Sequence, residues 1–365
     1  MNVARFDENS PWLKLFVEFG LPHKPFILEA SCTSKWASRK SWCTSDDEPN
    51  LQYLKENYGL SEVPLLDDNG DCSTMPFGEY LDGIGSGAIT SRVYLKDWHF
   101  QKCYGTSMYN LHPFFVMDWI NCENWTDDAT KNPFGDDYRF VYFGIAGTWT
   151  KFHSDVVASH SWSANICGLK QWYMIAPGQE KLFLRGKDFV EDMRTVDWSG
   201  IDVIQFVQKP GEIVFVPSNW YHQVHNITDS ISINHNWINA TNIQTVRKFI
   251  EQRKVEVEKE IDDSREHFTE EEFAEQIELI LFADARLNDE KLKRLSELVI
   301  DSRCDSDVCY VCPRHGYRIT SCITDHKCKH MVTSFCSCTM ETCSVCRQFV
   351  KSLELTVAST LFFDE

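Results

Sequence analysis

The residues with the clearest potential for chemistry lie in the string Gly147-Thr-Trp-Thr-Lys-Phe-His-Ser-Asp155. On a strand, alternate side chains face the same way, so His153 and Asp155 would project side by side while Ser154 points away. One imidazole and one carboxylate are two of the three ligands of the 2-His-1-carboxylate site that holds non-haem iron(II). Because an isolated His-x-Asp pair arises often by chance, this hypothesis needs a second histidine on a strand that can lie opposite.

A second histidine follows some tens of residues downstream. The segment Pro210-Gly-Glu-Ile-Val-Phe-Val-Pro217 is typical of a turn and an apolar strand, and it is followed by His222 and His225. Their odd spacing places them on opposite faces of a regular strand, so only one can face the interior. We select His222, which comes directly after the turn at 217–220. We interpret His225, like His160 and His235, as a packed or hydrogen-bonded histidine.

An iron held by His153, Asp155 and His222 keeps three open coordination positions, which in 2-oxoglutarate oxygenases are taken by the cosubstrate and dioxygen. A cation is then needed for the far carboxylate of the cosubstrate. Lys170 shares a strand face with Trp172 and Met174, where a lysine is costly unless it pairs with an anion. The alternative is a surface lysine whose stem covers apolar neighbours at the start of a strand.

Two further polar residues occur near these candidates. Thr150 precedes His153 by three residues, with one change of face, and its hydroxyl could donate near the rim of the site. Asn234 is polar within 230–237, where Ile231 and Ile233 face the other side.

The elements that must position these side chains are mostly short strands. Residues 1–90 are typical of mixed helix and loop, with Thr74 as the cap of a short helix that ends at Leu81. Many short strands separated by turn residues indicate a sandwich, jelly roll or barrel. We therefore predict a mainly β fold with helical additions. The strands are expected at 91–99, 138–143, 162–167, 170–175, 204–207, 212–216, 222–224 and 230–237.

The spacing of apolar residues becomes helical after Asn242. We predict a helix over 243–261, and a second helix that begins with a capping box at Thr269 to Glu272, flanked by Phe268 and Phe273 as a hydrophobic staple. These helices carry an apolar face, which either packs onto the β-core or forms a homodimer surface. Its members are Phe273, Ile277, Ile280, Leu281 and Leu287, followed by Leu292, Leu295 and Leu298.

From Val93 to Asn239 the chain resembles the JmjC-domain (cupin, double-stranded β-helix) Fe(II)- and 2-oxoglutarate-dependent oxygenases. The similarity covers Tyr94-Leu-Lys-Asp-Trp-His99, Asp136-Asp-Tyr-Arg-Phe-Val141, the His153/Asp155 pair, Trp162, Gly168-Leu-Lys170 and 210–217. The string His222-Gln-Val-His-Asn226 followed by Ser230-Ile-Ser-Ile-Asn-His-Asn-Trp237 is distinctive of one lysyl-hydroxylase subfamily.

The resemblance implies a role for each matching residue. His153, Asp155 and His222 match the iron ligands, and Lys170 and Thr150 match positions that bind the C5 carboxylate of 2-oxoglutarate. Two further positions assigned to the cosubstrate depart from the family pattern, because Asn234 stands where relatives often have Thr and Ser163 where they often have Asn. The implied fold is a double-stranded β-helix with C-terminal helices and a Cys-rich segment.

The subfamily implies hydroxylation of a lysine side-chain carbon in the eukaryotic translation release factor 1, and hence a role in translation termination. Two alternatives stay open. One is a JmjC histone lysine demethylase, which applies the same iron chemistry to an N-methyl carbon. The other is a non-catalytic cupin that uses the fold for binding.

Nine of the 15 cysteines lie in one tract after residue 300. The pairs Cys309-Tyr-Val-Cys312 and Cys343-Ser-Val-Cys346 have the Cys-x2-Cys spacing of zinc modules. The odd total argues against a disulfide framework. We expect structural zinc here, and the alternative is an unmetallated, partly disordered tail. The chain then divides into an N-terminal region (1–90), the catalytic β-core (91–240), C-terminal helices (241–300) and this Cys/His-rich segment (301–365).

The composition limits the classes of protein to which the chain can belong. Hydrophobic residues make up 43% and aromatic residues 13% of its 365 residues, enough for a sizeable core. The formal net charge of -18 disfavours nucleic acid and favours a basic, lysine-bearing protein partner. No apolar run reaches the length of a membrane span, and the first residues lack the apolar core of a signal peptide. We therefore expect a cytoplasmic protein, with the nucleus as the second choice.

Overall fold

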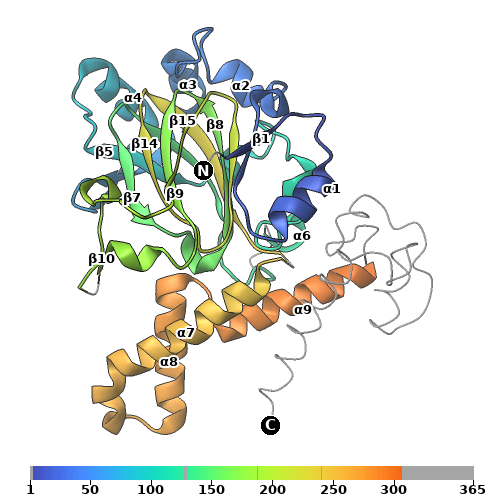
Figure 1. Ribbon diagram of the computed structural model, residues 1–365, viewed down its shortest axis with the longest axis vertical. Coiled ribbons are helices and arrows are strands. Elements are labelled where there is room, and N and C mark those ends of the chain that lie inside the picture. Colours follow the sequence, from blue (N-terminus) through green and yellow to red (C-terminus); the bar gives the residue numbers. More distant parts are fainter. Residues whose placement is uncertain (1–2, 127, 129, 187, 240, 306–365) are drawn as a thin grey trace.

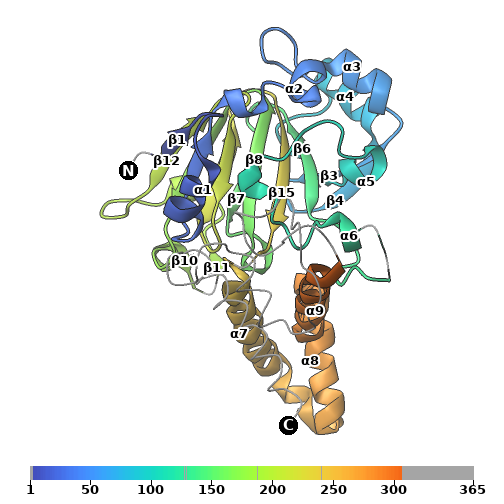
Figure 2. The same ribbon diagram turned by 90° about the vertical axis from the view of Figure 1, so that its right-hand side faces the viewer.

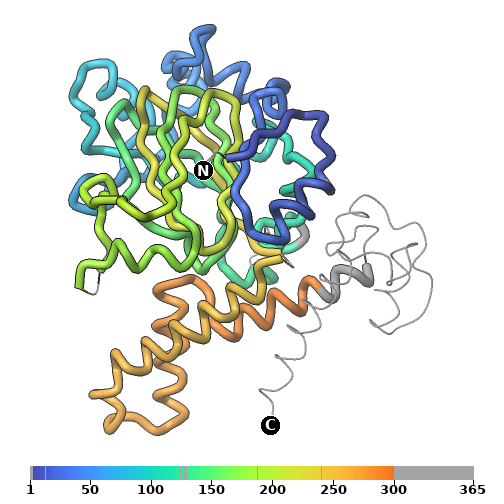
Figure 3. The backbone as a smooth tube through the Cα atoms, in the orientation of Figure 1, coloured from blue at the N-terminus to red at the C-terminus, as the bar shows by residue number. Residues whose placement is uncertain are grey.

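A computed structural model of the chain describes residues 3–126, 128, 130–186, 188–239 and 241–305 (Figure 1). Two β-sheets form its centre, short helices cover the sheets near the N-terminus, and longer helices extend from one end, as the chain trace in Figure 3 also shows. The cysteines proposed for zinc, Cys309, Cys312, Cys343 and Cys346, lie outside the described residues. Among the described helices, none combines the length and apolar character needed to span a bilayer.

The larger sheet has nine strands among the described residues, in the order β1-β2-β13-β8-β15-β6-β5-β3-β4. Its strand pairs are antiparallel except for the parallel pair β1 and β2. The bounds are β1 Ala4–Phe6, β2 Phe26–Leu28, β3 Glu62–Asp67, β4 Cys72–Pro76, β5 Val93–Trp98, β6 Arg139–Gly144, β8 His160–Cys167, β13 Ile213–Val216 and β15 Ser230–Trp237.

The smaller sheet has four antiparallel strands in the order β12-β9-β14-β7. Their bounds are β7 Trp149–His153, β9 Lys170–Ile175, β12 Ile204–Gln208 and β14 Tyr221–Asn226, and a small hairpin joins β10 Leu184–Arg185 to β11 Asp188–Phe189. A cavity between the two sheets is lined by residues of β6, β8 and β15 on one side and of β7, β9 and β14 on the other. The predicted double-stranded β-helix with C-terminal helices is confirmed.

The N-terminal region contains more strand than the sequence pattern indicated. The strands β1 to β4 extend both edges of the larger sheet, because β2 pairs with β13 and β3 pairs with β5. The helix predicted to start at Thr74 begins later: Thr74 lies in strand β4, and the helix α4 (Phe77–Ser86) starts after Pro76. Pairing with β3 decides the conformation of this segment, and tertiary pairing routinely overrides a local capping pattern.

Short helices pack against one face of the larger sheet and bury it. Besides α4, these helices are α1 Trp12–Leu15, α2 Ala37–Ser41, α3 Leu51–Tyr58, α5 Phe100–Tyr104 and α6 Glu123–Thr126. Large side chains from the helices and the sheet form one buried cluster, which includes Trp42, Phe77, Trp98 and Phe143. This packing leaves the opposite face of the sheet free to line the cavity between the sheets.

Three longer helices extend from one end of the sheets, as Figure 2 shows: α7 Ile243–Ile261, α8 Glu270–Ala285 and α9 Asp289–Asp305. The capping box at Thr269 and Glu272 is confirmed. The apolar residues of α8 and those of α9 pack against different parts of the protein. Phe273, Ile277 and Leu281 pack against Val257 of α7. The apolar residues of α9, with Leu287, join the main core. The expected packing onto the β-core therefore holds for α9, whereas α8 packs on α7.

Candidate metal centre and cosubstrate pocket

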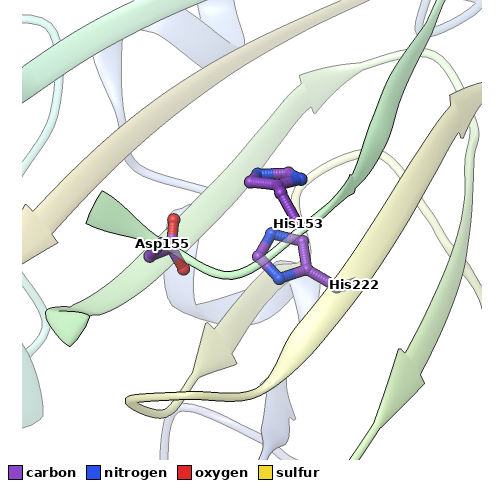
Figure 4. A group of neighbouring side chains, drawn as sticks. All are labelled: His153, Asp155 and His222. Carbon is purple, nitrogen blue, oxygen red and sulfur yellow. The ribbon is translucent and has the colours of Figure 1, made fainter. Parts of the chain in front are cut away.

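The structure brings His153, Asp155 and His222 together at one end of the smaller sheet, and Figure 4 shows the three side chains as a group. One potential ligand atom from each lies within 4.8 Å of the others. His153 is the last residue of β7 and His222 the second residue of β14, and the two are directly paired across the strands. Antiparallel pairing places both imidazoles on one face of the sheet, with ring centroids 4.4 Å apart.

Each histidine is held in the tautomer that a metal ligand requires. His153 Nδ1–H donates to the Lys151 carbonyl at 2.7 Å, and His222 Nδ1–H donates to the Trp220 carbonyl at 3.0 Å. Since Nδ1 carries the proton in both rings, Nε2 keeps its lone pair for a metal. Burial, together with neighbouring His222, lowers the pKa of His153 to about 3, so this ring is neutral at physiological pH.

Asp155 lies just beyond the strand, not on it as expected. It precedes the single 3-10 turn Val156–Ala158, in which Val157 and Ala158 have φ of 48° and 52°. Both residues are buried, and Val157 is part of the main core cluster with residues of α7. A β-branched residue at positive φ is strained, and this packing holds the strained turn in place. The core beneath this turn therefore holds the backbone that directly follows Asp155.

Two hydrogen bonds orient the Asp155 carboxylate. Ser161 Oγ donates to Oδ2 at 2.6 Å, and Asn236 Nδ2 donates to Oδ1 at 3.1 Å. Such donors fix the direction in which a carboxylate presents its remaining lone pairs. Sequence reasoning missed Ser161 and Asn236. The signal available for Asn236 was its place two residues after Asn234 on the same strand, which puts both side chains on one face.

These three residues satisfy the chemical requirements of iron(II). The donor set is two imidazole nitrogens and one carboxylate, which is the set found in non-haem iron oxygenases. The carbonyls of Lys151 and Trp220, with Ser161 and Asn236, supply the outer hydrogen bonds that metal ligands ordinarily have.

Lys170 lies deep in the cavity between the sheets, with only 2% of its surface exposed. Its Nζ donates to Ser232 Oγ at 2.8 Å, and Asn234 Nδ2 donates to the same oxygen at 3.1 Å. Burial lowers the pKa of Lys170 to about 7. Among the described residues no carboxylate pairs with it, so the cavity holds a buried amine that is complementary to the carboxylate of a ligand.

Thr150 faces the same cavity as His153 because the strands change register between them. Thr150 pairs with Val224 and His153 pairs with His222, so β7 has one more residue than β14 over this stretch. Thr150 Oγ1 accepts the Val224 backbone N–H at 3.1 Å. A hydroxyl has one proton and two lone pairs, so its O–H can still donate into the cavity.

Ser163 and Asn234 complete the predicted cosubstrate set, and they face each other across β8 and β15. Both line the same cavity as Lys170, Thr150 and the three metal-site residues. The cavity has a volume of about 70 Å³. It adjoins an outer cavity of about 420 Å³, and the residues shared by the two linings are Tyr94, Lys96, Thr150 and His153. Sequence reasoning did not assign Tyr94 or Lys96 to the site.

The other histidines pack as expected. His225 faces away from His222, stacks on Trp149 with the ring planes 6° apart, and hydrogen-bonds Gln223. His160 accepts the Ser218 backbone N–H at 2.8 Å. His235 stacks on Trp162 with ring centroids 4.2 Å apart. None of the three belongs to the group formed by His153, Asp155 and His222.

Comparisons with known proteins agree with this geometry. The family model described as "JmjC domain, hydroxylase" matches residues 140–237. The chain is 36% identical over 293 residues to the 2-oxoglutarate and iron-dependent oxygenase JMJD4 of Danio rerio, an alignment that covers 72% of this chain and 67% of the relative. The protein of the same name from Homo sapiens is 35% identical over 272 residues, covering 68% of this chain and 64% of the relative.

A plant relative is named for a different activity. The arginine-specific demethylase JMJ20 of Arabidopsis thaliana is 34% identical over 282 residues, covering 69% of this chain and 60% of the relative. The chain thus spans about two thirds or less of the length of these curated relatives.

Proposed function

The chain belongs to the JmjC-domain 2-oxoglutarate and iron-dependent oxygenases, in the group of the JMJD4 proteins, and from this membership we propose that it hydroxylates a lysine side-chain carbon of a protein substrate. The family resemblance inferred from the sequence motifs is confirmed. The observation that carries the proposal is the joint presence, in one cavity, of the two histidines and aspartate with the buried Lys170.

Each part of the cavity has a task in this reaction. His153, Asp155 and His222 would hold iron(II), and Lys170 and Thr150 would hold the distal carboxylate of 2-oxoglutarate, with Ser163 and Asn234 beside them. When bound, iron and 2-oxoglutarate supply the oxidation, in which dioxygen is consumed, 2-oxoglutarate becomes succinate and carbon dioxide, and one oxygen atom enters a substrate C–H bond.

The chain's own contribution is to position the reactants and to exclude water. Trp172 stacks on the His222 ring with the planes 24° apart, and it forms part of the cavity wall. His222 is itself buried. A dry wall beside the ligands limits the side reactions of an activated oxidant with solvent.

The outer cavity is lined by charged groups of both signs. Three are carboxylates (Asp67, Asp68 and Glu191) and three are cations (Arg92, Lys96 and Lys151). Arg92 Nε lies 3.6 Å from Asp68 Oδ2, and Lys151 is ion-paired with Glu191. A cationic side chain of a substrate can exchange with either cation at the mouth of the site. The net charge of -18 over the chain adds long-range attraction for a lysine-bearing protein.

We propose the eukaryotic translation release factor 1 as the substrate, because the subfamily that the sequence motifs resemble acts on it. The proposal places the reaction in translation termination and in the cytoplasm. A homodimer through the C-terminal helices is a further proposal, which the exposure of Val255 (49%) and Leu279 (61%) on α7 and α8 supports. Sedimentation of the full chain over a concentration series, with Leu279→Glu as the variant, tests it.

Demethylation is the second candidate, and the names of two relatives favour it. JMJ20 is named as an arginine-specific demethylase. The psr-1 protein of Caenorhabditis elegans, which is 25% identical, is named as a bifunctional arginine demethylase and lysyl-hydroxylase. These names support methylated arginine as the alternative target; the histone lysine that we considered from the sequence finds no such support in them.

Mass spectrometry of the product decides between the candidates. The full chain with Fe(II), 2-oxoglutarate and ascorbate is incubated with release factor 1 and, separately, with a methylarginine peptide. Hydroxylation adds one oxygen atom to a lysine, whereas demethylation removes a methyl group as formaldehyde. The His153→Ala variant is the control for metal dependence. If the iron-loaded chain converts no 2-oxoglutarate with any peptide, the non-catalytic cupin is the correct alternative.

A further inference from the structure

Lys96 lies where the inner and outer cavities meet, and the roles assigned above leave it unexplained. It is on β5 two residues after Tyr94, so the two side chains lie on the same face of the strand. Both residues line the inner cavity between the sheets and the outer cavity. Its Nζ lies 5.4 Å from the centre of the Tyr142 ring, which is within cation–π distance. The ammonium thus lies over a ring that lines the inner cavity.

The charge of Lys96 has no carboxylate partner among the residues that the structure describes. The carboxylate of the adjacent residue, Asp97, accepts a hydrogen bond from the Tyr142 hydroxyl at 2.7 Å. A partly buried cation without an anion retains the capacity to bind one, because the cost of removing it from water has not been offset by pairing. The aromatic ring alone is a weak substitute for a carboxylate.

The inner cavity therefore contains two ammonium groups at different depths. Lys170 lies at the closed end beside Ser232, and Lys96 lies at the opening shared with His153. Burial is the main cause of the lowered pKa of Lys170, and the charge of Lys96 adds to it. Two cations separated along a small cavity are complementary to a dicarboxylate.

We propose that Lys96 binds the C1 carboxylate of 2-oxoglutarate, the one next to the metal, while Lys170 binds the C5 carboxylate. The inference rests on the proposed function, since it takes 2-oxoglutarate as the cosubstrate. It makes Lys96 a cosubstrate-binding residue and not a metal ligand. The charge on Lys96 is then neutralised before a cationic lysine substrate reaches the opening of the inner cavity.

The test measures binding of two oxoacids to the full chain loaded with Mn(II), under anaerobic conditions and by calorimetry. The first is 2-oxoglutarate, and the second is 2-oxopentanoate, which keeps the C1 carboxylate and lacks the C5 carboxylate. The variants are Lys96→Met, Lys96→Arg and Lys170→Met. The control is Lys102→Met, because Lys102 is an exposed lysine that is ion-paired with Asp136 and lines neither cavity. Thermal unfolding confirms that each variant is folded.

We expect Lys96→Met to raise the dissociation constants of both oxoacids by about the same factor, roughly tenfold or more. Lys96→Arg restores most of the affinity, and Lys102→Met changes the affinity for neither oxoacid. Lys170→Met weakens the binding of 2-oxoglutarate but has little effect on the binding of 2-oxopentanoate. Equal affinity of wild type and Lys96→Met for both oxoacids overturns the proposal, as does a Lys96 effect confined to 2-oxoglutarate. If wild type with Mn(II) binds no 2-oxoglutarate, the proposed function itself fails.

Discussion

Thr150 and His153 face the same cavity although they lie three positions apart on one strand. In a regular strand they would lie on opposite faces. The register shift between β7 and β14 sets Thr150 opposite Val224 and His153 opposite His222, and residues 222 and 224 share a face. Strand irregularities of this kind occur often beside active sites, where they redirect a side chain. This one lets a single strand supply both a metal ligand and a hydroxyl to the cavity.

Replacing the Thr150 hydroxyl should weaken the binding of 2-oxoglutarate and leave the metal bound. We expect Thr150→Val to raise the dissociation constant of 2-oxoglutarate by about three- to tenfold, the usual effect of one lost hydrogen bond. Thr150→Ser keeps the hydroxyl and should bind nearly as well as wild type. Calorimetry with Mn(II) in place of iron measures both. An unchanged constant in Thr150→Val would show that the hydroxyl does not contact the ligand.

The two histidines of β14 should differ sharply in their effect on the metal. His222→Ala removes a ring whose centroid lies 4.4 Å from that of His153, whereas His225→Ala removes a ring stacked on Trp149 on the opposite face. We expect His222→Ala to lose most of the bound iron and all turnover, while His225→Ala retains the metal. Metal analysis of both purified variants checks this. Retention of iron by His222→Ala and its loss from His225→Ala would reverse the ligand assignment.

Binding of 2-oxoglutarate should depend on pH through Lys170. Burial lowers the pKa of this lysine to about 7 in the free protein, and a bound carboxylate favours the charged form and raises that pKa. Below about pH 6 the lysine is already charged, so binding takes up almost no proton and affinity is highest. Above about pH 8 the free lysine is neutral, so binding takes up close to one proton and affinity falls as pH rises.

Calorimetry in two buffers of different ionisation enthalpy measures this proton uptake at pH 8. Lys170→Arg is the matched control, because a guanidinium stays charged over this range and its variant should take up no proton from this site. Absence of proton uptake by wild type at pH 8 would mean that Lys170 is already charged before the ligand binds.

The hydrogen bonds to Asp155 should matter for metal affinity. Asn236→Ala and Ser161→Ala each remove one donor to the carboxylate. Loss of such an outer partner typically costs ten- to a hundredfold in metal affinity, and we expect a value in that range for the pair of substitutions together. Competition with a fluorescent chelator measures it. Asn234→Ala, which removes a neighbouring amide that does not contact Asp155, should leave the metal affinity close to wild type.

The Cys-rich tract should contain zinc independently of the iron site. We expect the full chain purified without chelator to carry zinc as well as about one iron, since paired Cys-x2-Cys motifs bind zinc tetrahedrally. Changing both Cys343 and Cys346 to Ser should remove zinc and leave the iron content unchanged. Plasma mass spectrometry reports both metals in one sample. Equal zinc in wild type and in the double variant would contradict the assignment.

The sequence by itself determined the chemical identity of the site and most of the strands that carry it. The His-x-Asp pair, the histidine after a turn and the lysine on an apolar strand face were visible because each residue type is unusual in its local pattern. The strands β9 and β15 and the helix α7 begin and end where the apolar spacing predicted. These features follow from local periodicity, which the order of residues contains directly.

Only the tertiary structure decided how these residues meet. The extra residue of β7, the position of Asp155 on a strained turn and the strands contributed by the N-terminal region all depend on pairing with segments distant in the sequence. The roles of Ser161, Asn236 and Lys96 emerge in the same way, because each is defined by a neighbour outside its own strand. Register and side-chain pairing across strands are non-local, so no local pattern specifies them.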